Sequence, residues 1–310
     1  MEWNQYLIQM PSIARGSFSK VYYGIHKDTK IEIALKKIWF HSLSDSIKDK
    51  IISEIHILQQ MNHPHVLKMK EYKCNGEYIF IITEYCNQTL EKWLDTKPSM
   101  DDKMNKITQI VSGIKYMHNH QIIHRDLKIQ NILLHQGIIK ICDFGFTKQV
   151  EENQLCHSMC GTPLYMSPEL LQGKPYSFSS DIWSLGIICF QIIHGRHPFG
   201  KPSDLQEYRA TIHNAITFPP FYEPFHSLLK SMLHVDPNQR PTADVIHSIL
   251  NEESDDEEDV TGRGKTNRGY DQVQIHTEYF TPPDLPPTPP LHPIPITKPS
   301  FINQLCSFFK

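Results

Sequence analysis

The stretch that most constrains this chain is the run 123–131, Ile-His-Arg-Asp-Leu-Lys-Ile-Gln-Asn, which a short apolar segment separates from Asp143-Phe144-Gly145. Asp126 can accept a proton, and Lys128 supplies a positive charge. Asn131 and Asp143 offer oxygen atoms, which are the ligands that Mg²⁺ prefers when it binds phosphates. A base, a cation and a magnesium site are the groups that phosphoryl transfer needs. The stretch therefore predicts a phosphoryl-transfer site.

These motifs resemble those of the eukaryotic-type serine/threonine protein kinases, whose catalytic loop reads HRDLxxxN and whose metal motif reads DFG. The resemblance covers the chain from about Tyr6 to Leu250. It implies an α+β fold with two lobes, a small β-sheet N-lobe with one main helix at about 1–85 and a larger, mainly α-helical C-lobe at about 86–250. It also implies a phosphotransferase that uses ATP and Mg²⁺ and acts on protein substrates.

The resemblance gives each polar residue of the catalytic loop a role. Asp126 would orient and deprotonate the substrate hydroxyl, Lys128 would steady the transferred phosphoryl group, and Asn131 with Asp143 would ligate magnesium. The family often has Pro-Glu at 129–130, where this chain has Ile-Gln, a departure at two positions that do no chemistry. Kinases that require arginines beside their target residue carry glutamates at positions 130 and 191. The glutamines found here predict no strong arginine requirement.

A phosphate-binding loop is indicated at 13–21, Ile-Ala-Arg-Gly-Ser-Phe-Ser-Lys-Val. This run looks like the glycine-rich loop of the kinases with two of its three glycines changed. The central Gly16 is kept, and the small residues Ala14 and Ser19 stand where the outer glycines would be. Backbone amides must approach phosphate closely, and small residues permit this better than large ones.

A lysine in the next expected strand has the spacing of a phosphate contact. Ile-Ala-Leu-Lys at 33–36 matches the family's VAIK motif, in which Lys36 would hold the α and β phosphates. A helix is predicted next, because apolar residues recur at helical spacing between 47 and 58, with Ser44 or Asp45 as its cap. Glu54 lies beside that apolar stripe and is expected to pair with Lys36.

The segment 83–86, Thr-Glu-Tyr-Cys, resembles the hinge that joins the two kinase lobes. There Glu84 and Cys86 would present backbone groups to adenine, and Thr83 would border the pocket behind the nucleotide. The nucleotide-binding residues that the resemblance implies are Ile13, Ala14, Arg15, Gly16, Ser17, Phe18, Ser19, Lys20, Val21, Ala34, Lys36, Glu54, Glu84, Cys86 and Leu133.

Other elements follow from apolar patterning. Strands are predicted at 6–13, 68–69 and 78–82, and Pro11 confines the first to a sheet edge or marks a bulge. A helix with one apolar face is predicted at 101–120, and a helix that is apolar nearly all round is predicted from Asp181 onward. The resemblance implies that Asp181 holds the backbone of the catalytic loop. It also implies that Glu169 and Arg240 form a buried, structural ion pair.

The polar stretch 146–161 and the following 161–169 resemble the kinase activation segment. Ser158 lies four residues before Thr162, where regulated family members carry their phosphorylated residue. We expect Arg125 to be buried beside the catalytic aspartate and to need an anion, which phosphoserine at 158 supplies. The further cations expected to meet that phosphate are Lys148 and Lys50. The alternative is an exposed loop serine, with Glu151 or Glu152 balancing Arg125.

Beyond residue 250 the composition changes, because 251–310 holds ten acidic and five basic residues, an acidic block at 252–259 and a proline-rich run at 281–299. Neither segment can bury enough apolar surface to fold alone. We therefore predict a disordered acidic and proline-rich tail over 251–310. Its proline-rich run is a candidate binding segment for partners, and an inert solubilising tail is the alternative. The rest of the chain carries a charge near +2, which does not suggest a nucleic-acid-binding protein.

Seven scattered cysteines without a CxxC pair suit a reducing compartment. The sequence shows neither an apolar run that could span a membrane nor an N-terminal signal peptide. We expect a cytoplasmic location, with the nucleus as the alternative. Cys156-His157-Cys160 is the one candidate zinc cluster, and the lack of a second cluster favours incidental thiols.

Lys128 in the catalytic loop and Thr162 in Gly-Thr-Pro are typical of serine/threonine rather than tyrosine kinases. The motifs at 13–21 and 161–169 look most like the autophagy-initiating kinases and their relatives, and the compact domain also suits a kinase encoded by a large DNA virus. A pseudokinase scaffold is the first alternative, suggested by the changed glycines and the tail. A small-molecule kinase of related fold is the second, and it should lack the motif at 161–169.

Overall fold

The computed structural model describes residues 2–16, 18–143, 163–214, 216–217 and 223–255. By its contacts the chain divides into two units, Met1–Ser254 and Asp255–Lys310. The predicted boundary after residue 250 falls inside the last helix, α9 (Ala243–Asp255), because the first residues of the acidic block are glutamates, which favour helix. The tail that we predict to be disordered lies outside the described residues from 256 onward.

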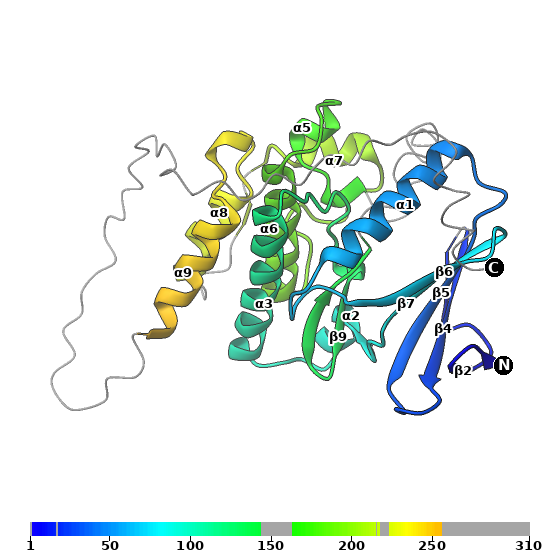
Figure 1. The fold of residues 1–310 in the computed structure, drawn as a ribbon. Coiled ribbons are helices and arrows are strands. Elements are labelled where there is room, and N and C mark those ends of the chain that lie inside the picture. Colours follow the sequence, from blue (N-terminus) through cyan, green and yellow to red (C-terminus); the bar gives the residue numbers. More distant parts are fainter. Residues whose placement is uncertain (1, 17, 144–162, 215, 218–222, 256–310) are drawn as a thin grey trace, which may run out of the picture. The chain divides into compact units, whose positions relative to one another are not determined.

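Residues 2–84 build one antiparallel sheet and one long helix (Figure 1). The strand order is β1-β2-β4-β5-β7-β6, with β3 paired to β4. The helix α1 follows β5 in the chain, so the predicted small sheet with one main helix is confirmed. The elements are β1 (Glu2–Trp3), β2 (Tyr6–Ile8), β3 (Ala14–Arg15), β4 (Ser19–His26), β5 (Glu32–Trp39), α1 (Asp45–Gln60), β6 (Met69–Cys74) and β7 (Tyr78–Glu84).

The two faces of this sheet have different roles because side chains alternate along each strand. Ile33 and Leu35 of β5 pack with Tyr6, Ile8 and Ile82 in a small core on one face. Lys36, one residue after Leu35, therefore points to the other face. Alternation along β5 thus buries a core on one side and presents the lysine on the side opposite.

Three predicted strands differ in length from the observed ones. The strand predicted over 6–13 ends at Ile8, and a separate short strand follows at Ala14–Arg15. Pro11 explains the break because it has no amide hydrogen to donate to a neighbouring strand. The strand predicted at 68–69 runs over Met69–Cys74, and the one predicted at 78–82 continues to Glu84. Polar residues at those extensions hid the strands from apolar patterning.

The described residues between 88 and 255 are mostly helical, with a three-stranded sheet in the order β10-β9-β8. Its strands are β8 (Gln88–Thr89), β9 (Ile132–His135) and β10 (Ile138–Ile141). Its helices are α2 (Leu90–Leu94), α3 (Met100–Asn119), α5 (Pro168–Leu171), α6 (Phe178–His194), α7 (Leu205–Thr211), α8 (Glu223–Met232) and α9. Short 3-10 turns lie at Ile129–Asn131, Pro163–Tyr165 and Pro237–Gln239.

Helices α3 and α6 lie side by side and carry the main core (Figure 1). The apolar face predicted for α3 is fully buried, at Ile107, Ile110, Val111, Ile114 and Met117. Burying each such side chain contributes roughly 1.5–3 kcal/mol, whereas the Ser99 cap, which accepts the Asp102 amide, contributes about 1 kcal/mol. Packing rather than capping therefore fixes the position of α3.

Helix α6 is buried nearly all round, as predicted, and Gly186 lets it approach α8 closely. A Cβ atom at position 186 would lie 3.0 Å from two side-chain atoms of Leu233 and 3.1 Å from the Cβ of Met232. In the part of the chain that the structure describes, no helix has the length and apolarity that crossing a membrane would require.

Burial of histidines makes the stability of this fold depend on pH. Burial lowers the pKa of His197 to about 4, although its hydrogen bond to the Leu164 carbonyl acts in the opposite sense. The pKa values of His63 and His194 are likewise lowered to about 4, chiefly by burial. Below the ordinary value of about 6.5, the unfolded chain takes up protons that the folded chain refuses.

We therefore expect the free energy of unfolding to fall as the pH is lowered from about 6.5 to about 4, and to be insensitive to these histidines above about 7. Urea unfolding at intervals between pH 7.5 and 4.5 measures this. His197→Gln, which can still donate to the Leu164 carbonyl, should flatten the dependence. An identical slope in the variant and in the wild type would show that His197 does not contribute.

Candidate active site

The catalytic loop is held by a buried carboxylate on α6. Asp181 accepts hydrogen bonds from the backbone amides of His124, at 2.7 Å, and Arg125, at 3.1 Å, which confirms its predicted role. Arg125 has a φ of +69°, a conformation that non-glycine residues adopt at a cost of about 1–3 kcal/mol. Charged hydrogen bonds to two successive amides stabilise that turn. The turn carries the chain directly into Asp126.

A histidine that the sequence did not single out also holds Asp181. His118, in the last turn of α3, places Nε2 3.1 Å from Asp181 Oδ2, with both side chains nearly buried. An ionised carboxylate needs a donor, so the imidazole presents an N–H at Nε2. The only local signal was a polar residue in the last turn of a helix whose buried face is apolar. His118 therefore positions the residue that positions the catalytic loop.

Asp126, Lys128 and Asn131 converge within the loop. Lys128 Nζ lies 2.8 Å from Asp126 Oδ2. Asn131 Nδ2 donates to the Asp126 carbonyl at 2.8 Å and lies 3.2 Å from Asp126 Oδ2. Because the amide nitrogen faces Asp126, the amide oxygen of Asn131 lies on the other side of its side chain, where it can meet a cation. The predicted base, cation and first metal ligand therefore form one cluster.

Asp143 is joined to this cluster through the backbone, because the amide of Cys142 donates to the Asn131 carbonyl at 2.9 Å. The Asp143 side chain is 55% exposed, and its Oδ1 lies 2.9 Å from Lys36 Nζ. The charge of Lys36 holds the pKa of Asp143 below its ordinary value, so the carboxylate is ionised at neutral pH. An ionised, accessible carboxylate and the amide oxygen of Asn131 are both hard oxygen ligands of the kind that Mg²⁺ takes.

Lys36 is thus paired with the second predicted metal ligand. Its predicted partner, Glu54, lies in α1, but the side chain of Glu54 is outside what the structure describes. The Lys36–Glu54 pair therefore stays a prediction. The observed pair brings the strand lysine and the predicted metal-binding carboxylate into direct contact, beside which the phosphates of a nucleotide would bind.

The predicted phosphate loop forms a turn between β3 and β4. Ala14 pairs with Val21 and Arg15 pairs with Lys20, while the Gly16 amide donates to the Ser19 carbonyl at 2.9 Å. Val21 lies opposite Lys36 on β5, which brings the loop to the lysine. Phe18 is exposed beside the turn, and Ser17 lies outside the described residues.

The predicted adenine-binding residues lie at the junction of the two sheets. Glu84 ends β7, and Ala34 is paired with Thr83 on the neighbouring strands. Leu133 of β9 is paired with Thr89, just after the hinge, and Cys86 lies between Glu84 and Thr89 in the chain. The structure therefore brings Ala34, Glu84 and Leu133 to the same junction, and their contact with adenine stays a prediction.

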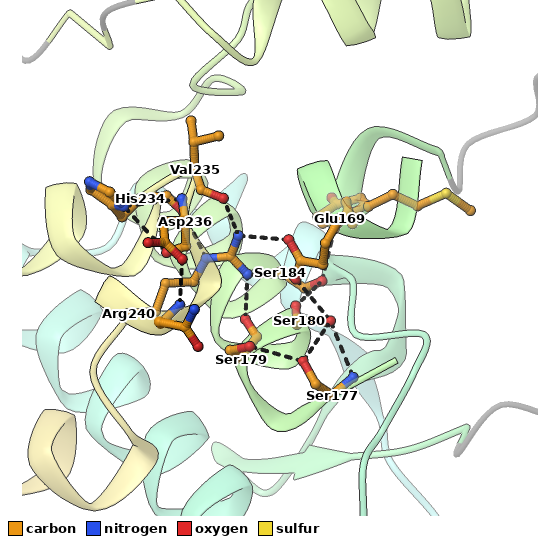
Figure 2. A network of polar contacts seen from close by, with 12 residues as sticks. Glu169, Ser177, Ser179, Ser180, Ser184, His234, Val235, Asp236 and Arg240 are labelled. Carbon is orange, nitrogen blue, oxygen red and sulfur yellow. Dashed lines mark hydrogen bonds and ion pairs between the residues drawn. The ribbon is translucent and has the colours of Figure 1, made fainter. Parts of the chain in front are cut away.

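The predicted pair of Glu169 and Arg240 is confirmed and is fully buried (Figure 2). Two nitrogens of the Arg240 guanidinium donate to the two carboxylate oxygens of Glu169, each at 2.8 Å. Arg240 also donates to the carbonyls of Ser179, His234 and Val235. Burial would raise the pKa of Glu169, but the bonds and charge of Arg240 outweigh it and hold the pKa below its ordinary value. The pair ties the segment after residue 163 to the end of the domain.

Two further findings concern surroundings that the sequence did not reveal. Gln130 Nε2 donates to Glu91 Oε1 at 2.6 Å, so a carboxylate from α2 lies beside a position where the sequence showed only a neutral amide. Arg125, which we expected to be buried, is exposed. That expectation was wrong because the buried Asp181 binds the backbone amide of Arg125, so burial of this turn does not require burial of the arginine side chain.

Most of the predicted activation segment lies outside the described residues. Residues 144–162 lie outside the described part of the chain, and they include Phe144, Gly145, Lys148, the cluster at 156–160, Ser158 and Thr162. The side chain of Lys50 is also outside it. Within the described residues, no group of three or more histidine, cysteine or acidic side chains is arranged to hold a metal.

Comparison with known proteins places this geometry in a family. The protein kinase domain family model matches residues 7–252. Serine/threonine-protein kinase 36 of Pongo abelii is 35% identical over 233 residues, which are 74% of this chain and 18% of that protein. Serine/threonine-protein kinase ATG1a of Arabidopsis thaliana is 31% identical over 245 residues, which are 75% of this chain and 39% of that protein.

The fold agrees with a solved structure. The crystal structure of Rad53 1-466 in complex with AMP-PNP matches with a TM-score of 0.66 and 28% identity, over 80% of this chain and 64% of that chain. The chain thus spans less than half the length of the two curated relatives and about two thirds of the solved one. The clustered Asp126, Lys128 and Asn131, the Lys36–Asp143 pair and the family match over 7–252 agree, and the chain belongs to the protein kinase family.

Proposed function

We propose that this chain is an ATP-dependent serine/threonine protein kinase that transfers the γ-phosphoryl group of ATP to serine and threonine hydroxyls of proteins. The observation that carries the proposal is the convergence of Asp126, Lys128 and Asn131 with the Lys36–Asp143 pair. The relatives are named serine/threonine kinases, and the Rad53 structure holds an ATP analogue. The test is transfer of labelled phosphate from ATP to a generic protein substrate, with Asp143→Ala as the control.

In this proposal each residue has one task. Asp126 accepts the proton of the substrate hydroxyl while the hydroxyl oxygen forms a bond to the γ-phosphorus of ATP. The bond from that phosphorus to the β–γ bridging oxygen breaks, which releases ADP. Lys128, 2.8 Å from Asp126, lies where it can neutralise charge on the transferred group. Lys36 receives the α and β phosphates. Asn131 and Asp143 would hold Mg²⁺, which neutralises phosphate charge when bound.

The two alternative functions fare less well. A pseudokinase scaffold usually arises by loss of a catalytic group, yet Lys36, Glu54, Asp126, Asn131 and Asp143 are all present. A small-molecule kinase should lack the motif at 161–169, which this chain has. The absence of a strong requirement for substrate arginines stays a prediction. The carboxylate of Glu91 beside Gln130 counts against it, because it can accept hydrogen bonds from one such arginine.

We further propose that phosphorylation of Ser158 raises the activity. The argument from a buried Arg125 fails, since this residue is exposed. The proposal rests instead on the charge and the acceptor oxygens that a phosphate at position 158 would add, which arginine side chains bind well. We expect phosphatase-treated protein and Ser158→Ala to be less active than untreated wild type. Activity assays combined with mass spectrometry of the loop measure this. Equal activity in all three, or full activity with Ser158 unmodified, would contradict it.

The remaining proposals concern the tail and the setting of the enzyme. The proline-rich run 281–299 would bind partners as an extended polyproline helix, which aromatic grooves recognise at low entropic cost. We propose a cytoplasmic location, with the nucleus as the alternative, and no nucleic-acid partner. The near-neutral charge of the kinase domain supports the last point.

A further inference from the structure

Lys140 is a buried lysine that lies outside the cluster of Asp126, Lys128 and Asn131. Among the residues that the structure describes, Lys140 is the only lysine in the buried set, at 8% exposure. It lies on β10, opposite Leu133 of β9 and three residues before Asp143. Removing an ammonium group from water is costly unless an anion compensates it. A lysine at this depth therefore depends on its partner.

That partner is the carboxylate of Glu84, in the predicted hinge. Lys140 Nζ lies 2.9 Å from Glu84 Oε1, and the two side chains are 11% and 16% exposed. The same oxygen accepts the Lys68 amide at 2.9 Å, and the Glu84 amide donates to the Lys68 carbonyl at 3.1 Å. One carboxylate thus joins the end of β7, the segment before β6 and strand β10.

The hinge continues along the same hairpin. The ring nitrogen Nδ1 of His135 lies 2.5 Å from the Tyr85 carbonyl, and Gln88 and Thr89 pair with Leu134 and Leu133. The segment 84–89, which includes most of the hinge, therefore contacts β9 and β10, and the ion pair is its first contact along the chain. The backbone groups that would receive adenine, at Glu84 and Cys86, lie at this attachment.

We propose that the Glu84–Lys140 ion pair is a positioning pair that sets the hinge backbone for adenine and so determines affinity for the nucleotide. This rests on the proposed kinase function. If the pair is lost, the hinge must be ordered when the nucleotide binds, and the cost of that ordering is subtracted from the binding free energy. Affinity for ATP and ADP then falls.

The reacting groups should be much less affected, because backbone bonds hold them independently. The Ile141 amide donates to the His65 carbonyl, the Leu67 amide donates to the Ile141 carbonyl, and the Cys142 amide donates to the Asn131 carbonyl, each at 2.9 Å. These bonds keep β10 and Asp143 in register when the Lys140 side chain is changed. The pair should therefore influence KM for ATP rather than kcat.

The test uses Glu84→Gln, Lys140→Met and the double variant. Glutamine keeps an acceptor for the Lys68 amide and removes the charge, and methionine keeps the apolar stem of Lys140. The measurements are the dissociation constant of ADP by calorimetry, which needs no turnover, and KM for ATP and kcat where transfer occurs. Lys73→Met is the matched control, because it removes an ammonium from the Lys73–Glu71 pair of the N-terminal sheet, whose side chains are 27% and 26% exposed.

Each single variant should weaken ADP binding by at least about fivefold, the factor that corresponds to ~1 kcal/mol, with kcat within about twofold of wild type. The double variant should weaken it by about as much as one single variant, since both remove the same interaction. Lys73→Met should bind ADP as the wild type does.

Three results would overturn the proposal. They are unchanged ADP affinity in the single variants, additive losses in the double variant, and a rise in kcat at unchanged KM, which would mean that the pair restrains the enzyme. The double variant leaves no unpaired buried charge, so it keeps the test decisive if a single variant fails to fold. Absence of phosphoryl transfer in the wild type would contradict the proposed function. The dissociation constant of ADP tests the role of the Glu84–Lys140 pair separately, because it needs no turnover.

Discussion

Replacing Asp126 with asparagine is expected to lower kcat by about 10²–10⁴-fold while leaving the melting temperature nearly unchanged. The Asp126 carboxylate is the group that can accept the substrate proton, and asparagine cannot. Asparagine has the same shape, and Asn131 would still donate to the backbone carbonyl at position 126, as it does at 2.8 Å in the wild type. Turnover and thermal unfolding measured on the same preparation separate chemistry from stability.

Lys36→Met extends the same expectation to phosphate binding. Lys36 is paired with Asp143 across 107 positions of sequence, so its loss removes charge from both the phosphate site and the metal site. Most turnover should disappear with the fold intact. Lys48→Met is a matched control, because it removes an ammonium whose contacts are Asp45, 91% exposed, and the ring of Phe40, and neither belongs to the predicted site. Wild-type transfer no faster than that of Asp126→Asn would contradict the proposed role of the aspartate.

Replacing Arg240 with methionine is expected to cost about 3–5 kcal/mol of the free energy of unfolding, which is a large share of the ~5–15 kcal/mol typical of a protein. The reason is that Glu169 would be left as an unpaired buried charge, with side chains that are 0% exposed for Arg240 and 6% for Glu169 in the wild type. Urea unfolding measures the loss. The double variant Glu169→Gln/Arg240→Met should recover part of it, because it removes both charges.

The matched control for this prediction is a pair at the surface. Lys115→Met breaks the ion pair with Asp244, whose side chains are 31% and 52% exposed, and should change stability by less than about 1 kcal/mol. A loss in Arg240→Met no larger than in Lys115→Met would contradict the view that burial gives the Glu169–Arg240 pair its effect.

Features encoded by neighbouring residues could be predicted from the sequence. Helices α1 and α3 follow from apolar residues at helical spacing, and the catalytic loop follows from a run of nine residues with a known chemistry. Asp181 and the Glu169–Arg240 pair were reached through the family's pattern, and the geometry confirms both. The position of Lys36 followed from its spacing after the phosphate loop.

Contacts between distant segments could not be predicted in the same way. His118 with Asp181, Gln130 with Glu91 and Glu84 with Lys140 each join residues that no local pattern connects. The burial of Arg125 was also predicted wrongly, because a buried aspartate at position 126 does not require the side chain before it to be buried. The end of the first strand was missed because Pro11 was expected to be tolerated at a sheet edge or in a bulge, whereas the strand ends before it, at Ile8.

The most direct test of the kinase account is transfer of labelled γ-phosphate from ATP to a generic protein substrate, followed by identification of the labelled amino acid. The account predicts label on serine and threonine in the presence of Mg²⁺, and loss of that label in Asp143→Ala, which removes the carboxylate that pairs with Lys36. Transfer by the wild type no greater than by Asp143→Ala, or label confined to tyrosine or to a small molecule, would contradict it.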